Sequence, residues 1–167
     1  MNELRSIFQN VNDGDEIILE KNRIYDVRPE DSFNLKGFFC SNTAKRDENP
    51  EGTRYTAIYL DNKRNITIDG NGATVMVHGK MTPMLFYGCE NITVKNLAVD
   101  YKVPTMTEFT VLANDDGIIT IKINDDCLYR VEGNTLYWHG EENENGEYYW
   151  ENECNAPKRY FKVFEPV

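Results

Sequence analysis

Short alternations of apolar and polar residues run along most of this chain, and they predict strands. The exception is the N-terminus, where apolar residues recur at helical spacing: Leu4, Ile7, Phe8 and Val11. This spacing predicts a short amphipathic helix, which the turn residues at 12–15 should end. Strands are expected next, at 16–19 and 23–27. A helix placed first is a common cover for the end of a repeating core.

The clearest internal repeat lies in the centre of the chain. Asn65-Ile66-Thr67-Ile68 and Asn91-Ile92-Thr93-Val94 are about 26 residues apart, and each precedes a second short strand, at 73–77 and 97–99. A strand at 55–60 extends the pattern upstream. A period in the twenties with several short strands is typical of a solenoid whose coils stack in register. We expect the two asparagines to stack and to bond backbone inside the coil turns.

Beyond residues 100–104 the pattern changes to that of hairpins. Alternating strands at 109–111 and 119–123 flank Asp115-Asp116-Gly117, and strands at 128–131 and 135–138 flank a second turn. Another alternating strand is expected at 160–164, and the acidic tract at 141–153 is expected to be a solvated loop. Asn114 to Gly117 lacks the ligand spacing of a calcium loop, so no metal site is expected there.

The predicted fold class is therefore all-β with two parts. Residues 1–104 should form a capping helix followed by parallel coils, and residues 105–167 an antiparallel β module. Neither part ends in a closing element, so we expect the chain to stop at a module boundary or a truncation.

Composition narrows the possible partners. The chain has 167 residues and a net charge of −10, from 18 basic and 28 acidic side chains. This charge disfavours phosphate backbones and anionic lipids, so neither nucleic acid nor membrane is an expected partner. The N-terminus has no signal-peptide pattern, which predicts a cytoplasmic location if the chain is complete. If the chain is a piece of a longer precursor, secretion or the cell surface remains open. The four cysteines (Cys40, Cys89, Cys127 and Cys154) lack metal-site spacing and are expected to be buried free thiols, without cofactor.

Residues 56–105 resemble a particular group of enzymes. The runs NITIDGNGA, HGKMTP and CENITVKNLAVDY, together with the earlier FFCSNTAKRDENP, look like glycoside hydrolase family 110, and the resemblance extends over roughly residues 14–140. It implies a right-handed parallel β-helix interrupted near Pro104 by an inserted barrel. It also implies hydrolysis of terminal α-1,3-linked galactose with inversion, by carboxylates in coils that follow the insertion. The 167 residues alone should then be inactive, with carbohydrate, further C-terminal coils or a second copy as partners.

Three carboxylates are candidates for acid–base chemistry: Asp69, Asp100 and Glu141. For Asp69 an Asp-Gly turn is the favoured alternative, and for Asp100 simply the end of a strand. Candidates for substrate binding follow from their polar or aromatic character: Arg54, His78, Lys80, Tyr101 and Trp138. Each has a structural alternative. His78 would be a structural histidine that bonds backbone, and Arg54 and Lys80 would be exposed cations with no binding role. Trp138, with Tyr137, would pack within a barrel.

Two other function classes compete with the hydrolase. A non-catalytic carbohydrate-binding or surface-recognition β-helix needs only exposed side chains and no acid–base pair. A pectin-lyase-like enzyme needs calcium-binding aspartates and an arginine base on one sheet, and the sequence offers no such set.

Overall fold

The computed structural model describes residues 3–39, 49–153 and 160–163. Strands dominate it, with one α-helix, α1 (Glu3–Phe8), and one 3-10 turn, η1 (Pro29–Asp31), which confirms the predicted all-β class. No helix within these ranges has the length and apolar character needed to cross a membrane. The chain divides into two compact units, Met1–Lys102 and Val103–Val167. Whether they are coils and the start of an inserted barrel stays a prediction.

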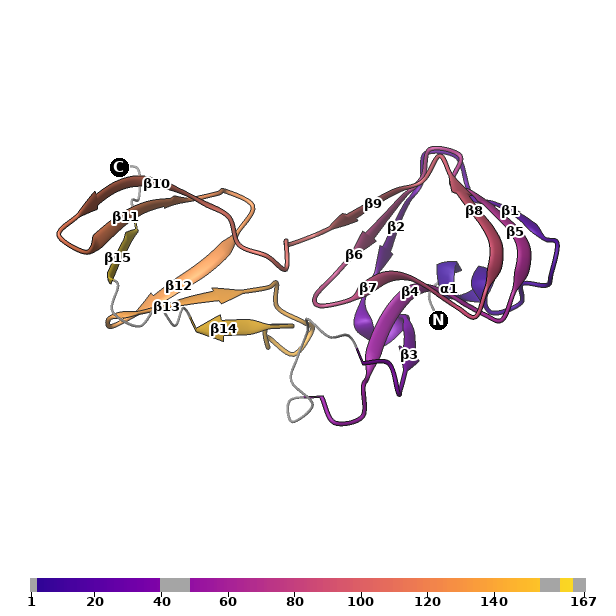
Figure 1. The fold of residues 1–167 in the computed structure, drawn as a ribbon, viewed down its shortest axis with the longest axis horizontal. Coiled ribbons are helices and arrows are strands. Elements are labelled where there is room, and N and C mark those ends of the chain that lie inside the picture. Colours follow the sequence, from indigo (N-terminus) through magenta and orange to yellow (C-terminus); the bar gives the residue numbers. More distant parts are fainter. Residues whose placement is uncertain (1–2, 40–48, 154–159, 164–167) are drawn as a thin grey trace. The chain divides into compact units, whose positions relative to one another are not determined.

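The first unit contains three three-stranded sheets, ordered β1-β5-β8, β2-β6-β9 and β3-β4-β7 (Figure 1). Their strands are β1 (Glu16–Ile18), β2 (Ile24–Val27), β3 (Phe33–Leu35), β4 (Arg54–Asp61), β5 (Arg64–Asp69), β6 (Thr74–Val77), β7 (Thr82–Tyr87), β8 (Glu90–Lys95) and β9 (Ala98–Tyr101). All pairs are parallel except β3 with β4. Residues of the sequence repeat are in register, as Thr67 with Thr93 shows.

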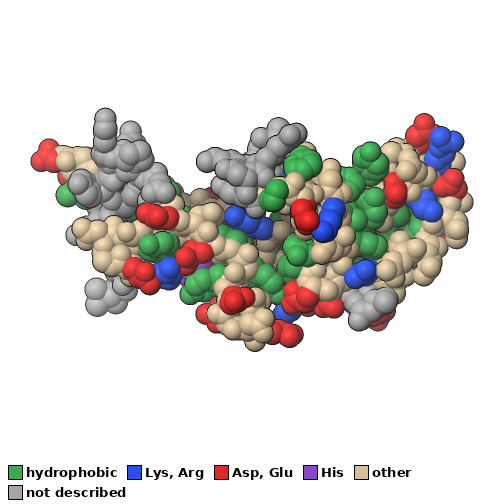
Figure 2. Space-filling model, turned by 90° about the horizontal axis from the view of Figure 1, so that it is seen from below, with side chains coloured by type: hydrophobic (Ala, Val, Ile, Leu, Met, Phe, Trp, Pro, Cys, Tyr) green, Lys and Arg blue, Asp and Glu red, His purple; other side chains and the backbone are tan. Residues whose placement is uncertain are grey.

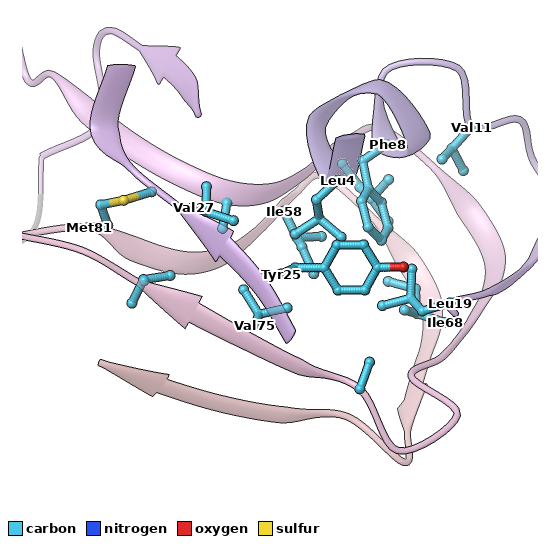
Figure 3. Packing of buried hydrophobic residues seen from close by; sticks show 14 of the residues in the cluster. Leu4, Phe8, Val11, Leu19, Tyr25, Val27, Ile58, Ile68, Val75 and Met81 are labelled. Atoms are coloured by element: carbon cyan, nitrogen blue, oxygen red, sulfur yellow. The ribbon is translucent and has the colours of Figure 1, made fainter. Parts of the chain in front are cut away.

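The core of this unit lies between the three sheets. Alternate residues of successive strands point inward and are fully buried, among them Ile58, Ile66 and Val75. Leu4 and Phe8 of α1 pack against the same cluster, as Figure 3 shows beside the ring of Tyr25. The predicted helix is therefore present and covers core residues.

Asparagine and glycine shape the corners between strands. Asn22, Asn71 and Asn96 all adopt left-handed backbone angles (φ 55°, 51° and 53°), which asparagine tolerates better than most residues. Asn65 and Asn91 are also left-handed, and Asn91 Nδ2 donates to Asn65 Oδ1 over 2.7 Å. The two asparagines thus stack as predicted, but they bond each other's side chains.

Strands β7, β8 and β9 each have one paired edge among the described residues. Their inward side chains are less covered than those of the preceding strands. Ile92 and Val99 are only half-buried, whereas Ile66 and Val75, their in-register partners, are buried. This side of the core therefore presents apolar surface.

The second unit consists of two further three-stranded sheets, β10-β11-β15 and β12-β13-β14. The strands are β10 (Phe109–Asp115), β11 (Ile118–Ile123), β12 (Leu128–Glu132), β13 (Thr135–His139), β14 (Glu151–Glu153) and β15 (Tyr160–Val163). Both predicted hairpins are confirmed as antiparallel pairs, β10 with β11 and β12 with β13. The prediction of a purely antiparallel module is wrong, because β15 pairs in parallel with β11. Ile121, Ile123, Cys127 and Leu136 form a small core.

The expectation of a solvated loop at 141–153 is wrong in its last part. Glu151 pairs with His139 across β13 and β14, and the preceding Trp150 is only 6% exposed. A loop sequence rich in acid can still end in a strand when a neighbouring strand supplies the backbone partners. Cys89 and Cys127 are free thiols, as predicted, but only Cys127 is buried and Cys89 is half-buried. Cys40, Cys154 and most of the FFCSNTAKRDENP segment lie outside the described residues.

Candidate functional site

Polar side chains gather where β2, β6 and β9 end. Asp26 of β2 is in register with Met76, and Met76 is in register with Asp100 of β9. Register partners on adjacent strands point to the same face of a sheet. The two carboxylates therefore lie on one face, on either side of Met76. His78 follows β6 directly, and Tyr101 ends β9.

His78 and Asp26 form the best-defined contact of this group. The His78 Nε2 atom lies 3.0 Å from Asp26 Oδ1, and the His78 backbone N donates to the Val27 carbonyl over 3.0 Å. The imidazole is 4% exposed, whereas the Asp26 side chain is 62% exposed. A buried ring is thus held in one orientation by a carboxylate that is open to solvent.

Asp100 completes the group, and Tyr101 follows it at the end of β9. Asp100 is exposed, and its Oδ1 accepts from the Tyr101 backbone N over 2.8 Å. The Tyr101 hydroxyl donates to the Met81 carbonyl over 3.1 Å. Burial raises the pKa of the Tyr101 phenol, so it remains a neutral donor at physiological pH. The Tyr101 ring packs against the core, so it lies on the opposite face of the sheet from Asp100. We call Asp26, His78 and Asp100 the β9-end cluster.

This cluster offers two exposed carboxylates next to a fixed imidazole. Strands are spaced about 4.8 Å apart, so the backbones that carry Asp26 and Asp100 are separated by roughly 9.6 Å. Such groups can accept hydrogen bonds from several hydroxyls of one bound sugar. Of the predicted residues, His78 and Asp100 therefore lie near the ends of neighbouring strands, whereas the Tyr101 ring faces the core.

The other candidates of the first unit lie elsewhere or stand apart. Lys80 is exposed in the turn after His78. Arg54 begins β4 in a different sheet, and its Nη1 donates to the Thr53 carbonyl over 3.0 Å.

Asp69 is committed to the corner between β5 and β6. Its Oδ1 accepts from the Asn71 backbone N over 2.9 Å and from Asn96 Nδ2 over 3.0 Å. Lys95 Nζ lies 3.4 Å from its Oδ2. The hydrogen bond from Asn96 is the main cause that lowers the pKa of this carboxyl, with Asn71 and Lys95 adding to it. Such an ionised, bonded carboxylate suits a structural turn better than a proton donor.

Trp138 and Glu141 belong to the second unit. The Trp138 ring stacks parallel to Phe109 at a centroid distance of 6.4 Å and meets Tyr129 edge-on at 6.3 Å. Glu141 is half-buried, and its carbonyl accepts from the Tyr149 backbone N over 3.1 Å. Both residues are placed among packing contacts of that unit.

Asp26 is the member of the cluster that sequence reasoning missed. The alternation of Ile24-Tyr25-Asp26-Val27 does place it outward, which is a usable signal. Its contact with His78 joins residues 52 positions apart, and only the register of β2 with β6 reveals it.

No group of three or more His, Cys, Asp or Glu side chains within the described ranges is arranged to hold a metal ion.

Comparison with known proteins places this chain beside α-1,3-galactosidases. No protein-family profile matches it. Alpha-1,3-galactosidase A of Bacteroides thetaiotaomicron is 36% identical over 104 residues, which cover 62% of this chain and 18% of that protein. The A enzyme of Bacteroides fragilis is 30% identical over 117 residues (70% and 19%). Alpha-1,3-galactosidase B of Akkermansia muciniphila is 30% identical over 124 residues (74% and 15%).

These relatives confirm the predicted resemblance to the α-1,3-galactosidases. The chain spans less than a fifth of the length of each of the three. The similarity therefore concerns a limited part of a much longer enzyme.

Proposed function

We propose that this chain is part of a glycoside hydrolase that releases terminal α-linked galactose. The observation that carries the proposal is the 36% identity over 104 residues to an α-1,3-galactosidase. The chemistry of the exposed surface agrees with it. A neutral sugar is not repelled by a net charge of −10, and the exposed carboxylates of the β9-end cluster can accept hydrogen bonds from hydroxyls.

The proposal includes the fold of the whole enzyme. We infer that the first unit contributes coils of a right-handed parallel β-helix and that the second begins an inserted barrel. The parallel, in-register pairing of β5 with β8 and of β6 with β9 supports coils that stack one on the next. Further coils would pair with the open edges of β7, β8 and β9. They would also cover the half-buried Ile92 and Val99.

The mechanism that we propose is hydrolysis with inversion. One carboxylic acid protonates the leaving oxygen while a carboxylate on the other side of the ring activates water, at a separation of roughly 6.5–9.5 Å. We place this pair in coils outside the 167 residues, as the resemblance implies. Asp26 and Asp100 would then hold substrate hydroxyls, while His78, fixed by Asp26, keeps the rim of the site in shape.

Galactose release from an α-1,3-linked galactose disaccharide tests this proposal. The product of the complete gene and the 167-residue chain should be assayed side by side. We expect galactose from the complete product alone. Activity of the 167-residue chain would refute the placement of the acid and base outside it. If the complete product binds the disaccharide without cleaving it, the non-catalytic carbohydrate-binding alternative is correct.

A further inference from the structure

Aromatic side chains gather on the outer face of the sheet formed by β4 and β7, away from the β9-end cluster. Phe38 contacts both Tyr59 and Tyr87 there, and we call these three residues the aromatic patch. The Phe38 ring meets Tyr87 edge-on at a centroid distance of 5.3 Å and Tyr59 edge-on at 6.3 Å. Figure 2, seen from below, shows hydrophobic side chains at the surface in the part of the molecule where this sheet lies, with charged groups between them.

The alternation of the strands explains why these rings point outward. Met84 and Phe86 of β7 pack against the core, so Tyr87 faces the opposite side. Ile58 and Leu60 of β4 are buried, and Tyr59 between them faces outward for the same reason. Tyr87 is 55% exposed. Tyrosine is enriched at interfaces, and a group of exposed apolar side chains often marks a binding surface. The exposed Tyr87 ring, in contact with another aromatic ring, fits this description.

Polar groups lie directly beside the rings. Asp61 is the register partner of Tyr87, and the Asn62 backbone N donates to the Tyr87 carbonyl over 2.8 Å. Asn62 Nδ2 in turn donates to Asp61 Oδ1 over 2.7 Å, and both side chains are exposed. Burial, with the Asp61 charge second, raises the pKa of the Tyr59 phenol, which therefore remains protonated.

We propose that the aromatic patch, with Asp61 and Asn62 at its rim, is a binding site for a neutral hexopyranose. One face of a pyranose ring carries C–H groups and packs on an aromatic ring, whose face is negative, while the hydroxyls at the ring edge need acceptors and donors. The patch offers both. An anionic ligand is disfavoured because Asp61 lies at the rim and the whole chain is acidic.

This site differs from the one proposed for the hydrolase. It needs no acid–base pair, and its residues come from β4, β7 and the segment before residue 40. The choice of galactose as the probe rests on the proposed function, but the patch itself is independent of catalysis. Such a site would hold a neighbouring sugar of a glycan.

Saturation-transfer-difference NMR on the 167-residue chain tests the inference, with methyl α-D-galactopyranoside as the probe. We expect transfer to the probe, and about tenfold weaker binding for Tyr87→Ala, because loss of one ring contact costs on the order of 1.4 kcal/mol. Tyr87→Phe should retain binding because it keeps the ring. Ile24→Ala is the matched control, since Ile24 is an apolar residue with a similar 60% exposure on another sheet.

Several results would overturn the inference. They are no transfer to the probe, transfer unchanged in Tyr87→Ala, and equal transfer to an anionic sugar such as N-acetylneuraminic acid. A Tyr87→Ala variant that loses a dimer in sedimentation without losing the probe would assign the patch to a second copy of the chain. Thermal melts show whether each variant is folded. If Tyr87→Ala is unfolded, the test rests on Tyr87→Phe, and loss of binding by a folded Tyr87→Phe would overturn the inference. Hydrolysis by the complete gene product is measured separately, so failure of one proposal leaves the other open.

Discussion

Asp69 and Asp100 are both exposed to some degree at strand ends, yet their surroundings differ. Asp69 accepts hydrogen bonds from Asn71 and Asn96 and lies near Lys95. The described contact of Asp100 is with the backbone of the next residue, Tyr101. A carboxylate that accepts hydrogen bonds from two corners of the fold stabilises the structure, whereas one whose outer side is exposed can bind a ligand.

The role of Asp69 predicts a dependence of stability on pH. Its pKa is lower in the folded chain than its ordinary value, so it stabilises the fold above the unfolded pKa of about 3.9 and loses that contribution as pH falls through the folded pKa. We expect Asp69→Asn to lower the melting temperature at pH 7 and to narrow its difference from wild type below about pH 4. Glu144→Gln, at an exposed carboxylate of the second unit, is the control. A difference that stays constant between pH 7 and pH 2 would contradict this role.

The role of Asp100 predicts a kinetic effect in the complete gene product. A hydrogen bond from a substrate hydroxyl to a charged group contributes about 1.5 kcal/mol, so Asp100→Asn should raise KM for the disaccharide about tenfold with little change in kcat. Glu90→Gln, at an exposed carboxylate on another sheet, should leave both constants unchanged. A loss of kcat by several orders of magnitude would instead make Asp100 one of the catalytic pair.

Residue-level chemistry could be predicted where it depends on local sequence. The Asp69 turn was expected because Asp-Gly-Asn-Gly has its own turn chemistry. The contact of His78 with Asp26 was not expected, because it depends on the register between β2 and β6, which are far apart in the sequence. The aromatic patch was missed for the same reason, since Phe38 meets Tyr87 from a distant part of the chain.

At the scale of elements, the spacing between neighbouring corners depends on small residues. Gly70 shows this best. A Cβ built on it would lie 2.5 Å from the Asn96 carbonyl oxygen and 2.6 Å from the Leu97 Cα atom, both backbone atoms of the corner between β8 and β9. Gly14, in contrast, has a φ of +87° but no atom within 4 Å of such a Cβ.

Alanine at these two glycines should therefore have unequal effects. Gly70→Ala forces backbone apart and should lower the free energy of unfolding by about 3 kcal/mol. Gly14→Ala meets open space and should cost only the left-handed conformation, about 1 kcal/mol. Urea unfolding followed by circular dichroism measures both. Equal losses of stability, or a larger loss at Gly14, would mean that the corner at Gly70 does not approach the corner at Asn96 and Leu97 this closely.

Elements with a clear period were predicted, and those without one were missed. The NIT strands alternate and repeat, so β5 and β8 were expected. The run Thr82-Pro-Met-Leu-Phe-Tyr87 of β7 contains proline and a continuous apolar stretch, which gives no period of two. The short β3 forms its backbone hydrogen bonds with β4. The local sequence does not indicate this pairing, so β3 was missed.

At the scale of the whole molecule, composition and pattern predicted the all-β class, and the recognised motifs predicted the relatives. The similarity to α-1,3-galactosidases covers at most about three-quarters of this chain and less than a fifth of each relative named above. Under the proposed function, the catalytic carboxylates lie in coils outside the 167 residues. The first unit would then contribute surface on which a galactoside is held.

The most direct test of this account is the anomeric form of the first sugar released. Proton NMR can follow the complete gene product as it acts on an α-1,3-linked galactose disaccharide, before mutarotation mixes the anomers. The account predicts that β-galactose appears first, because an inverting acid–base pair delivers water to the opposite face of the ring. The early appearance of α-galactose would contradict the inverting mechanism, and the absence of any galactose would contradict the assignment to a galactosidase.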